Sequence, residues 1–309
     1  MNAAIRAVVR TCVYNGITPY GIYQGYDGLI NDKIEPMDAG SVKHIIHQGG
    51  TILKSTRSEE FRTEAGMQKA WQNIQDYELD GLVVIGGDGT FTGAMRFGKK
   101  FDFPIVGIPG TIDNDIFGTD FTVGFDTAVN TVVEAVDKIR DTATSHNRLF
   151  FIEVMGRDAG FIAVYSGIAA GAEEVLIPEK DRGIEKLFKS LEKTSKRQKS
   201  SRLVIVAEGD KNGSVYDLED KVKAHFGDRY ETKVTILGHV QRGGRPSCAD
   251  RVLASRLGVT AIEALRDGHR GIMVGFRDRD VRFTDFEKAT KQNPKMDKEL
   301  LRIADIISI

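Results

Sequence analysis

The sequence predicts an α/β fold with mainly parallel sheets and helices on both faces. Short β-rich runs alternate with longer helical patterns along almost the whole chain, as βαβ units require. The composition, with 41% hydrophobic and 28% charged residues, is that of an ordinary globular protein. The 309 residues provide room for two domains, or for one large α/β unit, around a substantial core.

Eight runs are the candidate strands, and helical patterns fall between them. The runs are Thr18–Tyr23, Gly81–Ile85, Pro104–Ile108, Leu149–Val154, Val175–Ile177, Leu203–Ala207, Val234–Leu237 and Gly271–Phe276. The clearest helix is expected over Thr127–Arg140, where branched apolar residues recur on one stripe. The uncharged stretch Ala159–Ala172 is too short to span a bilayer and is expected to form a buried helix. The first ten residues are also expected to be helical.

The net charge argues against some classes of binding partner, and the cysteine content indicates the cellular setting. The formal net charge is −1, so no bulk positive field draws the chain to nucleic acid or to a membrane. An anionic ligand must therefore be held by locally placed arginines. Cys12 and Cys248 are far apart and belong to no zinc-spaced set, which favours a reduced, cytoplasmic setting.

The first motif with chemical content is Gly86–Thr90 (Gly-Gly-Asp-Gly-Thr), which follows a predicted strand. Its glycines let the backbone turn sharply and approach a ligand closely. Thr90 is expected to be the N-cap of the next helix, whose amino end favours phosphate. Asp88 is expected to hold Mg²⁺ directly or through water. The alternative is an ordinary structural turn, because this composition suits turns in general.

The second motif is Pro109–Asp115 (Pro-Gly-Thr-Ile-Asp-Asn-Asp), which carries two aspartates two positions apart. One of Asp113 and Asp115 is expected to take the proton of a hydroxyl, while the other orients a metal ion or a partner. A structural Asx-turn is the alternative, and Asn114 favours it. Both motifs follow strands, where parallel sheets bind their ligands. Together they indicate phosphoryl transfer to an alcohol.

Four segments resemble the signature set of bacterial-type ATP-dependent 6-phosphofructokinases, the phosphofructokinase A family. They are Ile85–Thr90, Gly107–Asp115, Glu153–Arg157 (Glu-Val-Met-Gly-Arg) and Leu237–Gly244 (Leu-Gly-His-Val-Gln-Arg-Gly-Gly), and their order and intervals also match. The resemblance implies two three-layer α/β/α domains with mainly parallel sheets and an active site in the cleft between them. It implies an ATP-binding domain over residues 1–124 plus about 242–291. A fructose 6-phosphate-binding domain would span 125–241 plus about 292–309.

The resemblance also implies the reaction, which is phosphorylation of the 1-hydroxyl of fructose 6-phosphate by ATP with Mg²⁺, the committed step of glycolysis. Asp113 would be the base, and Thr111 and Arg157 would stabilise the transferring group. Asp115 would lie near the metal and the base, and Asp88 would serve Mg²⁺. The residues expected to face ATP are Arg57, Ser58, Gly87, Asp88, Gly89 and Thr90. The residues expected to contact the sugar phosphate are Thr111, Ile112, Asp113, Arg148, Met155, Gly156, Arg157, Glu208, Lys233, His239, Val240, Gln241 and Arg242.

The cationic residues of this set carry further expectations. By resemblance, Arg148 and Lys233 reach across from a neighbouring subunit, which implies a homotetramer. Since a sugar phosphate needs fixed cations, Arg148, Arg157 and Arg242 are expected to converge at one sheet edge. Lys233 stands where many relatives have arginine and lacks its two-pronged contact, so weaker sugar-phosphate affinity is expected. Ser58 stands where relatives often have a bulkier residue beside the ATP-facing arginine, so the resemblance does not determine how the adenine ring would be packed.

Two glycines predict the phosphoryl donor. Pyrophosphate-using relatives resemble Gly-Gly-Asp-Asp and Pro-Lys-Thr-Ile-Asp-Asn-Asp, which place Asp and Lys where this chain has Gly89 and Gly110. A carboxylate at position 89 would repel a nucleotide α-phosphate, whereas glycine leaves room. ATP is therefore the expected donor.

An effector site is also implied by the resemblance. In allosteric bacterial relatives a basic site between subunits binds ADP as activator and phosphoenolpyruvate as inhibitor. The matching positions are Arg6, Arg10, Arg140, Glu173 and Lys199. Ala39 falls where a basic residue is common, so a weakened effector site is expected.

The start of the sequence departs from the family pattern. Relatives carry a first strand and a Gly-Gly-Asp turn immediately before the helix that begins here at Met1. An unpaired strand edge and an exposed apolar face are therefore expected, with poor stability and low activity. Two alternatives stay open: another GGDGT-type kinase acting on NAD or a lipid, or a non-catalytic regulatory or assembly subunit.

Overall fold

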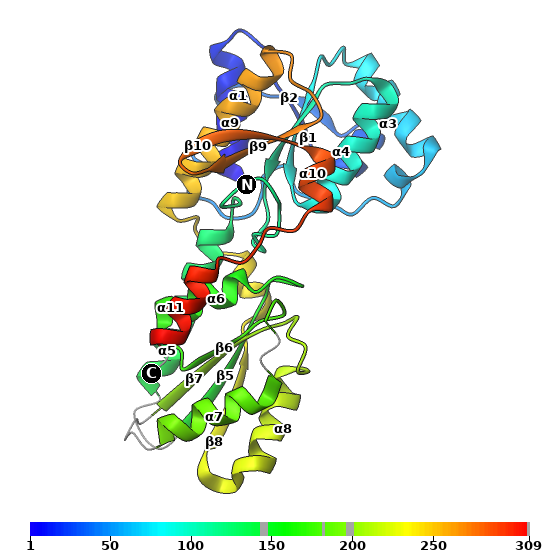
Figure 1. Cartoon of the computed structure of the whole chain (residues 1–309). Helices are drawn as coiled ribbons and strands as arrows, with labels where there is room; N and C mark the ends of the chain where they lie inside the picture. The colour runs from blue at the N-terminus through cyan, green and yellow to red at the C-terminus, as the bar shows by residue number, and fades with distance from the viewer. Residues whose placement is uncertain (143–147, 181–182, 196–200, 308–309) are drawn as a thin grey trace. The chain divides into compact units, whose positions relative to one another are not determined.

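The computed structural model of the protein describes residues 1–142, 148–180, 183–195 and 201–307 (Figure 1). The chain divides into two compact units. Unit 1 comprises Met1–Thr111, Ile116–Gly124 and Gly244–Pro294, and unit 2 comprises Ile112–Asp115, Phe125–Gly243 and Lys295–Ile309. Each unit is built around its own mainly parallel or fully parallel sheet.

The main sheet of unit 1 has four described strands in the order β10-β9-β4-β3. Their bounds are β3 (Leu82–Gly86), β4 (Ile105–Pro109), β9 (Ile272–Arg277) and β10 (Asp280–Asp285). β3, β4 and β9 are parallel, and β10 is antiparallel to β9. The β9–β10 hairpin turns at Asp278 and Arg279, whose φ angles are 52° and 70°. Positive φ at both central residues is the mark of a type I′ turn.

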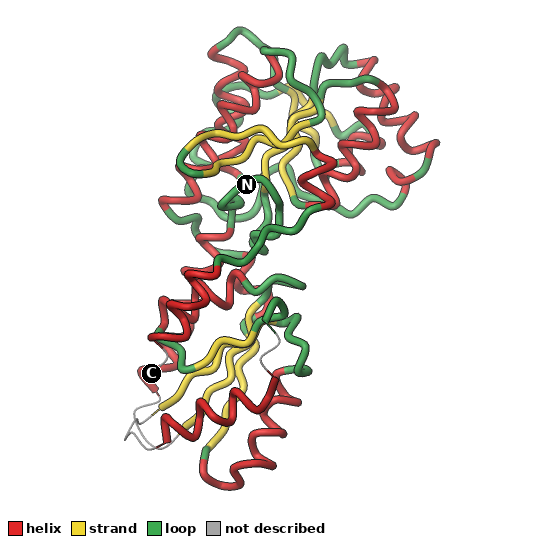
Figure 2. The backbone as a smooth tube through the Cα atoms, viewed as in Figure 1, coloured by secondary structure: helices red, strands yellow, loops and turns green. Residues whose placement is uncertain are grey.

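Helices cover both faces of this sheet (Figure 2). Apolar residues of α1 (Asn2–Tyr14) and α9 (Cys248–Arg266) pack with Val106 and Ile108 on one face. On the other face, Val84 and Ile105 pack with α2 (Tyr26–Ile30), α3 (Glu64–Asp76), α4 (Asp88–Phe101) and α10 (Phe286–Lys291). The alternation along each strand is the two-residue period of a sheet buried on both sides.

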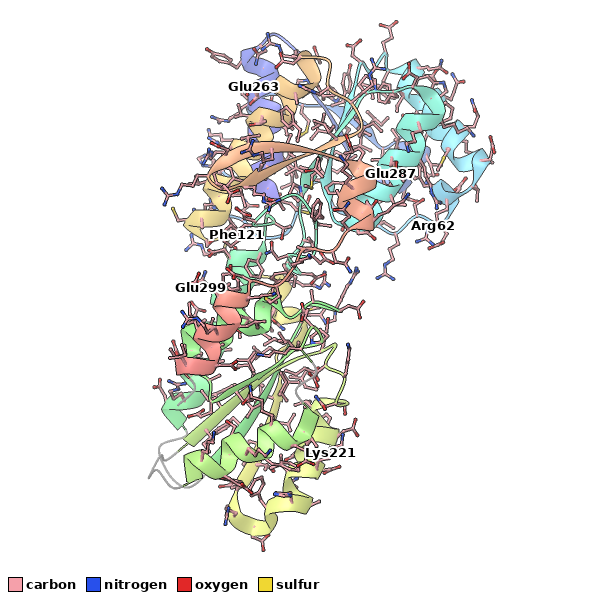
Figure 3. All side chains as sticks on the ribbon, viewed as in Figure 1. Arg62, Phe121, Lys221, Glu263, Glu287 and Glu299 are labelled. Carbon is pink, nitrogen blue, oxygen red and sulfur yellow. The ribbon has the colours of Figure 1, made fainter. Side chains whose placement is uncertain are left out.

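An exposed ion pair joins two helices of the second face. Lys99 of α4 lies 3.3 Å from Glu287 of α10, and Figure 3 labels this glutamate. Figure 3 also labels Arg62, the last residue of the short 3-10 helix Glu60–Arg62, which precedes α3. Lys99 and Glu287 are both well exposed, so this ion pair adds little to stability. The apolar contacts hold the helices on this face of the sheet.

A second, two-stranded sheet in unit 1 joins β1 (Tyr20–Ile22) and β2 (Ile34–Pro36) in antiparallel fashion. It is separate from the main sheet. Among the strands that the structure describes, β3 pairs with β4 alone, so it forms an edge. The expected unpaired strand edge is therefore present.

Unit 2 is built on a fully parallel sheet with the strand order β6-β7-β5-β8. Its strands are β5 (Arg148–Val154), β6 (Glu174–Leu176), β7 (Ser201–Ala207) and β8 (Glu231–Ile236). One face packs on α5 (Phe125–Thr142), α6 (Phe161–Ala170) and α11 (Lys298–Ile307), and the other on α7 (Gly183–Ser195) and α8 (Val215–Phe226). Alternate residues of β5 face opposite sides, with Ile152 in one core and Phe151 in the other.

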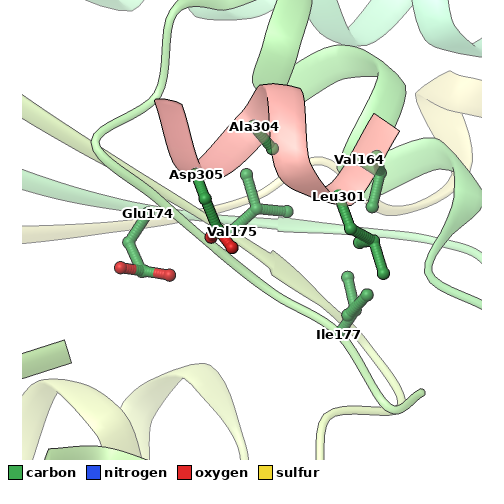
Figure 4. Close-up of a pocket in the computed structure, with 7 residues that line it drawn as sticks. All are labelled: Val164, Glu174, Val175, Ile177, Leu301, Ala304 and Asp305. Atoms are coloured by element: carbon green, nitrogen blue, oxygen red, sulfur yellow. The ribbon is translucent and has the colours of Figure 1, made fainter. Parts of the chain in front are cut away.

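The C-terminal helix α11 is anchored by apolar and ionic contacts within unit 2. Figure 4 shows residues of α6, β6, α11 and the segment after β6 around a small pocket: Val164, Glu174, Val175, Ile177, Leu301, Ala304 and Asp305. Asp305 lies 3.2 Å from Lys180 and 3.3 Å from Lys186. The last described turns of the chain therefore pack against the core of unit 2.

The α/β class, the three-layer arrangement of each unit and all eight candidate strands are confirmed. The helices expected at the first ten residues, at Thr127–Arg140 and within Ala159–Ala172 are also present. β2 and β10 were not predicted. No helix among the described residues is long and apolar enough to cross a membrane. The functional assignment of the two domains and an active site in a cleft between them remain predictions.

Candidate active site

The two sequence motifs of unit 1 lie side by side where β3 and β4 end. The backbone N–H of Gly110 donates to the carbonyl of Gly86 at 2.9 Å. A Cβ placed on Gly87 would lie 3.6 Å from the Cβ of Thr111, so the phosphate-loop candidate touches the start of the second motif. The Thr111 carbonyl accepts from the Thr122 hydroxyl at 2.6 Å. The carboxyl ends of adjacent parallel strands thus gather both motifs, as expected for such sheets.

The turn after β3 leads directly into helix α4, which begins at Asp88 with Gly87 as its N-cap. The expectation that Thr90 is the N-cap is therefore wrong. Thr90 lies inside the first turn, where its side chain approaches Gly86, and a Cβ on Gly86 would come within 2.2 Å of its Oγ1. The turn is compact because Gly86 lacks a side chain. The backbone N–H groups of the first helical turn remain suited to an anion.

Asp88 and Gly89 are exposed in this first turn, and a Cβ on Gly89 would meet nothing within 4 Å. Among the residues that the structure describes, no group of three or more His, Cys, Asp or Glu side chains forms a metal cluster. One carboxylate fits a Mg²⁺ that keeps waters and binds mainly to nucleotide phosphates, because Mg²⁺ rarely occupies all-protein cages.

Arg57 and Ser58 lie in the segment ahead of the 3-10 helix Glu60–Arg62. Arg57 is exposed. The Ser58 hydroxyl accepts from the backbone N–H of Phe61 at 3.2 Å, a local contact that organises the start of this helix. Ser58 thus has a structural task in addition to the nucleotide contact predicted for it.

In unit 2 a buried carboxylate faces an exposed guanidinium. The Oδ2 atom of Asp113 lies 3.7 Å from Nε of Arg157, and the side chains are 5% and 60% exposed, respectively. Asn114, next in the chain, is buried and has a φ of 54°, and Ile112 and Asp115 are half-buried. The carboxylate is sheltered, while the cation reaches solvent, where a ligand would arrive.

The turn Met155–Arg157, just beyond the end of β5, has unusual backbone geometry. Gly156 has a φ of 145° and Arg157 a φ of 52°, and the second value is uncommon for a residue with a side chain. One carboxylate oxygen of Glu208 accepts from the N–H groups of Gly156 at 3.2 Å and Arg157 at 2.7 Å. A Cβ on Gly209 would lie 2.1 Å from the Arg157 carbonyl oxygen. Glu208 and Gly209, at the end of β7, therefore cradle this turn.

Gln241 holds the same turn from another element. It lies in the 3-10 helix Gly238–Arg242 and is 1% exposed. Its Oε1 accepts from the backbone N–H of Met155 at 3.1 Å, and its Nε2 donates to the carbonyl of Gly238 at 3.0 Å. His239, Val240 and Arg242 of the same helix are exposed. The predicted sugar-phosphate residues therefore include an exposed set and two that hold the turn by hydrogen bonds: Gln241, which is buried, and Glu208, which is exposed.

Arg148 and Lys233 form a separate cationic pair. Arg148 is the first residue of β5, and Lys233 is paired across from Phe150 on β8. Both cations pair with Glu231, at 3.1 Å and 2.9 Å. These contacts hold the pKa of the Glu231 carboxyl below its usual value, through hydrogen bonds from Lys233 and then Arg148.

The arrangement corrects the expected convergence of three arginines. Arg157 and Arg242 follow the carboxyl ends of β5 and β8, whereas Arg148 starts β5 and lies at the opposite edge. Sequence reasoning overlooked Glu231. Its spacing of two from Lys233 on a strand places both side chains on one face, and this was the available signal.

The predicted effector residues are distributed over both units. Arg6 and Arg10 lie on α1 in unit 1, and Lys199 lies outside the described residues. In unit 2, a guanidinium nitrogen of Arg140 donates to the carbonyl of Ala170. Glu173 is 6% exposed, and its carboxylate accepts from the backbone N–H of Leu203 at 2.6 Å. Glu173 therefore already supports the sheet.

Comparison with known proteins identifies relatives of one kind, the phosphofructokinases. A family model described as phosphofructokinase matches residues 1–265. Over 309 residues, the chain is 48% identical to ATP-dependent 6-phosphofructokinase 2 of Bacteroides thetaiotaomicron, matching 100% of this chain and 94% of that relative. It is 50% identical to ATP-dependent 6-phosphofructokinase of Halalkalibacterium halodurans, matching 100% and 95%.

Among solved structures, phosphofructokinase from Saccharomyces cerevisiae superposes with a TM-score of 0.90 at 34% identity. The match covers 94% of this chain and 43% of the yeast chain, so this chain spans less than half of that protein. Because the family model covers most of the sequence and bacterial relatives match it from end to end, the chain belongs to the phosphofructokinase family.

Proposed function

We propose that the protein transfers the γ-phosphoryl group of ATP to the 1-hydroxyl of fructose 6-phosphate, giving fructose 1,6-bisphosphate and ADP. The observation that carries the proposal is the sheltered Asp113 carboxylate 3.7 Å from the exposed Arg157 guanidinium. A kinase acting on an alcohol needs a base for the hydroxyl proton and a cation for the moving phosphoryl group. The Asp113–Arg157 pair supplies one of each.

Asp113 acts as the base in this proposal. As the sugar oxygen attacks the γ-phosphorus, its proton passes to the Asp113 carboxylate, the bond from the γ-phosphorus to the bridging oxygen breaks, and ADP leaves. Arg157 and Thr111 stabilise the charge of the transferring group, and Asp115 supports the base. Fixed donors of this kind act because they need no rearrangement during the reaction.

The phosphates of ATP bind the amino end of α4 and the backbone from Gly87 to Thr90, with Arg57 and Ser58 facing the nucleotide. This proposal is supported by the compact turn at Gly86 and by the open space beside Gly89. When bound, Mg²⁺ neutralises charge on the phosphates. Asp88, exposed at the first helical turn, would hold it directly or through water.

The open space beside Gly89 also supports ATP over pyrophosphate as donor. No protein atom lies within 4 Å of a Cβ placed at this glycine, so packing does not dictate its identity, and room remains for an α-phosphate. Gly110 is more confined, with Ile85 Cγ2 3.1 Å from its Cβ position. We expect Gly89→Asp to raise the KM for ATP, while Gly89→Ala leaves it nearly unchanged. Equal KM values for the two variants would contradict this role.

Fructose 6-phosphate is held by the outward residues of unit 2, with Ile112 and the backbone of Met155 and Gly156. The outward side chains are Arg157, His239, Val240 and Arg242. Arg148 and Lys233, which are gathered by Glu231 at the other edge of the sheet, serve the site of a neighbouring subunit in a homotetramer. A monomer with full activity in sedimentation and activity assays would contradict the assembly.

Regulation and location complete the proposal. ADP and phosphoenolpyruvate are the proposed effectors, acting through Arg6, Arg10, Arg140, Glu173 and Lys199, and the enzyme works in the cytoplasm. The inward hydrogen bond of Glu173 supports a weakened response. Activation by ADP as strong as in allosteric relatives would contradict that weakening.

The decisive test is a coupled assay with fructose 6-phosphate and either ATP or pyrophosphate. We expect turnover with ATP and little with pyrophosphate. Asp113→Ala should lower kcat by about 100-fold to 10,000-fold, the range for a lost general base. Asp76→Ala, at an exposed position of α3, is the matched control and should behave as the unaltered protein. Unchanged turnover in Asp113→Ala would remove Asp113 from the role of base. Comparable rates with both donors would overturn the choice of ATP.

A further inference from the structure

The loop that follows β4 carries Thr111 of the proposed site and contacts the turn that follows β3. The N–H of Gly110 donates to the carbonyl of Gly86 at 2.9 Å. A Cβ placed on Gly87 would lie 3.6 Å from the Cβ of Thr111. Both contacts lie within unit 1. On its other side, the loop offers carbonyl groups that accept hydrogen bonds from a more distant segment of the same unit.

That segment is Ile116–Gly124, which the structure describes throughout and which contains no strand or helix. The backbone N–H of Val123 donates to the carbonyl of Pro109 at 2.8 Å. The hydroxyl of Thr122 donates to the carbonyl of Thr111 at 2.6 Å, and the Thr122 side chain is completely buried. The segment therefore orients two successive carbonyl groups of the loop that carries Thr111.

A buried carboxylate anchors the end of this segment. One oxygen of Asp250, which is 3% exposed, accepts from the backbone N–H of Gly124 at 2.7 Å. Asp250 lies in the first turn of α9, and its own N–H donates to the hydroxyl of the N-cap residue Ser247 at 3.2 Å. The proposed reaction gives this carboxylate no chemical task. Because hydrogen bonds accepted by a carboxylate are short and strong, Asp250 can hold the segment at a fixed place on α9.

We propose that Thr122 is a positioning residue for the phosphoryl transfer. Its hydroxyl fixes the direction of the Thr111 peptide group, so that the Thr111 side chain is held where the transferring group arrives. The same peptide group leads along the chain into Ile112 and the base Asp113. This inference rests on the proposed function, in which Thr111 stabilises the transferring group.

The test compares three variants with the unaltered protein. Thr122→Val keeps the branched shape of the side chain and removes its hydroxyl, whereas Thr122→Ser keeps the hydroxyl. Thr119→Val is the matched control in the same segment. Thr119 is 8% exposed, and its hydroxyl donates to the carbonyl of Phe121 at 2.8 Å rather than to the loop after β4.

We expect Thr122→Val to lower kcat by about 10-fold to 100-fold, the scale of a small misplacement of a reacting group. The KM values for ATP and fructose 6-phosphate should change little, and Thr122→Ser should retain most of kcat. Thr122→Val and Thr119→Val should both lower the urea midpoint, because each removes a buried hydrogen bond. Thr119→Val should nevertheless keep its kcat. If Thr122→Val does not fold, Thr122→Ala, which also lacks the hydroxyl, is measured in its place with the same expectation.

Amide hydrogen exchange of Gly110 tests the same contact without catalysis. The N–H of Gly110 joins the loop after β4 to Gly86. Once the Thr122 hydroxyl is removed, we expect this amide to exchange about tenfold faster than in Thr119→Val, as for the loss of one hydrogen bond from a local structure. Equal exchange in Thr122→Val and Thr119→Val would overturn the proposal.

The kinetic outcomes separate this inference from the proposed function. An active unaltered protein with unchanged kcat in Thr122→Val, or with an equal loss of kcat in Thr119→Val, would overturn the positioning role alone. An unaltered protein without turnover on ATP and fructose 6-phosphate would overturn the proposed function and the positioning role together.

Discussion

The phosphate loop of unit 1, Gly86–Thr90, and the Met155–Arg157 turn of unit 2 both follow parallel strands, but different interactions hold them. The loop is shaped by backbone and by the lack of side chains at its glycines. The turn is held from outside by Glu208 and Gln241, which lie far along the chain. We therefore expect side-chain atoms added to the glycines to disturb the phosphate loop. We expect removal of the hydrogen-bond acceptors of Glu208 and Gln241 to disturb the Met155–Arg157 turn.

The largest expected effect in this comparison is on the turn. Glu208→Ala removes the oxygen that accepts from Gly156 and Arg157, so Arg157 loses its position beside Asp113. We expect kcat to fall by about 100-fold, the scale of a small misplacement of a reacting group. Glu208→Gln keeps an acceptor and should retain most of kcat.

Steady-state kinetics separate this positioning role from direct binding of the sugar. A positioning role lowers kcat with little change in the KM for fructose 6-phosphate, and the glutamine variant rescues it. A large rise in KM with unchanged kcat would instead identify Glu208 as a direct ligand of the substrate.

The loop is tested by a matched pair of alanine variants. In Gly86→Ala the new Cβ would lie 2.2 Å from Thr90 Oγ1, whereas in Gly89→Ala it meets nothing within 4 Å. We expect Gly86→Ala to lower the free energy of unfolding by about 1–3 kcal/mol, as for overpacking. Gly89→Ala should be neutral or slightly stabilising, since it lies in a helix. Urea unfolding measures both, and equal losses would show that the loop is not limited by space at Gly86.

The smallest effect concerns the pH dependence of stability. Burial raises the pKa of the Glu153 carboxyl above its ordinary 4.5, a backbone hydrogen bond from Val215 offsets part of this, and the charge of Glu208 adds to the rise. The folded state therefore binds this proton more tightly than the unfolded state. The resulting stability is present below about pH 4.5 and is lost as the pH rises through the folded pKa.

Glu153→Gln should therefore raise the urea midpoint at pH 7 and leave it nearly unchanged at pH 4. Glu287→Gln is the control of opposite sign, because hydrogen bonds from Lys291 and then Lys99 lower the pKa of Glu287. That variant should lose a little stability at pH 7. A Glu153→Gln protein that is less stable than the unaltered one at pH 7 would contradict the assignment.

The sequence predicted the parts of the fold that depend on local pattern. Apolar β-branched runs identified the central strands most clearly, because β4, β5 and β7 are buried on both faces. β10 was missed because its exposed residues carry charges and its turn, Asp278-Arg279, lacks the glycine that usually marks a type I′ turn.

The sequence predicted those parts of the site whose positions follow from the ends of the strands. The neighbouring positions of the two motifs follow from parallel pairing. The inward orientation of Gln241 and the two bonds to Glu208 depend on contacts between residues 51 to 86 positions apart, which no local pattern encodes. The first residue of the helix after β3 was misjudged because Gly87, with no capping side chain, ends the turn before Thr90.

The chain crosses between the two units several times, and this has a consequence for biosynthesis. Unit 1 needs α9 and β9, from beyond Gly244, to complete its core, whereas the buried core residues of unit 2 all lie within residues 125–230 and α11 only covers them. A ribosome therefore releases most of the chain before the core of unit 1 can close, so unit 1, although it begins first, cannot complete its fold first during translation, as N-terminal domains usually do. We expect a chain ending at Gly243 to be digested rapidly by protease, and protection of residues 1–111 in such a fragment would contradict this. Until α9 and β9 emerge, the incomplete core of unit 1 must be kept from aggregation.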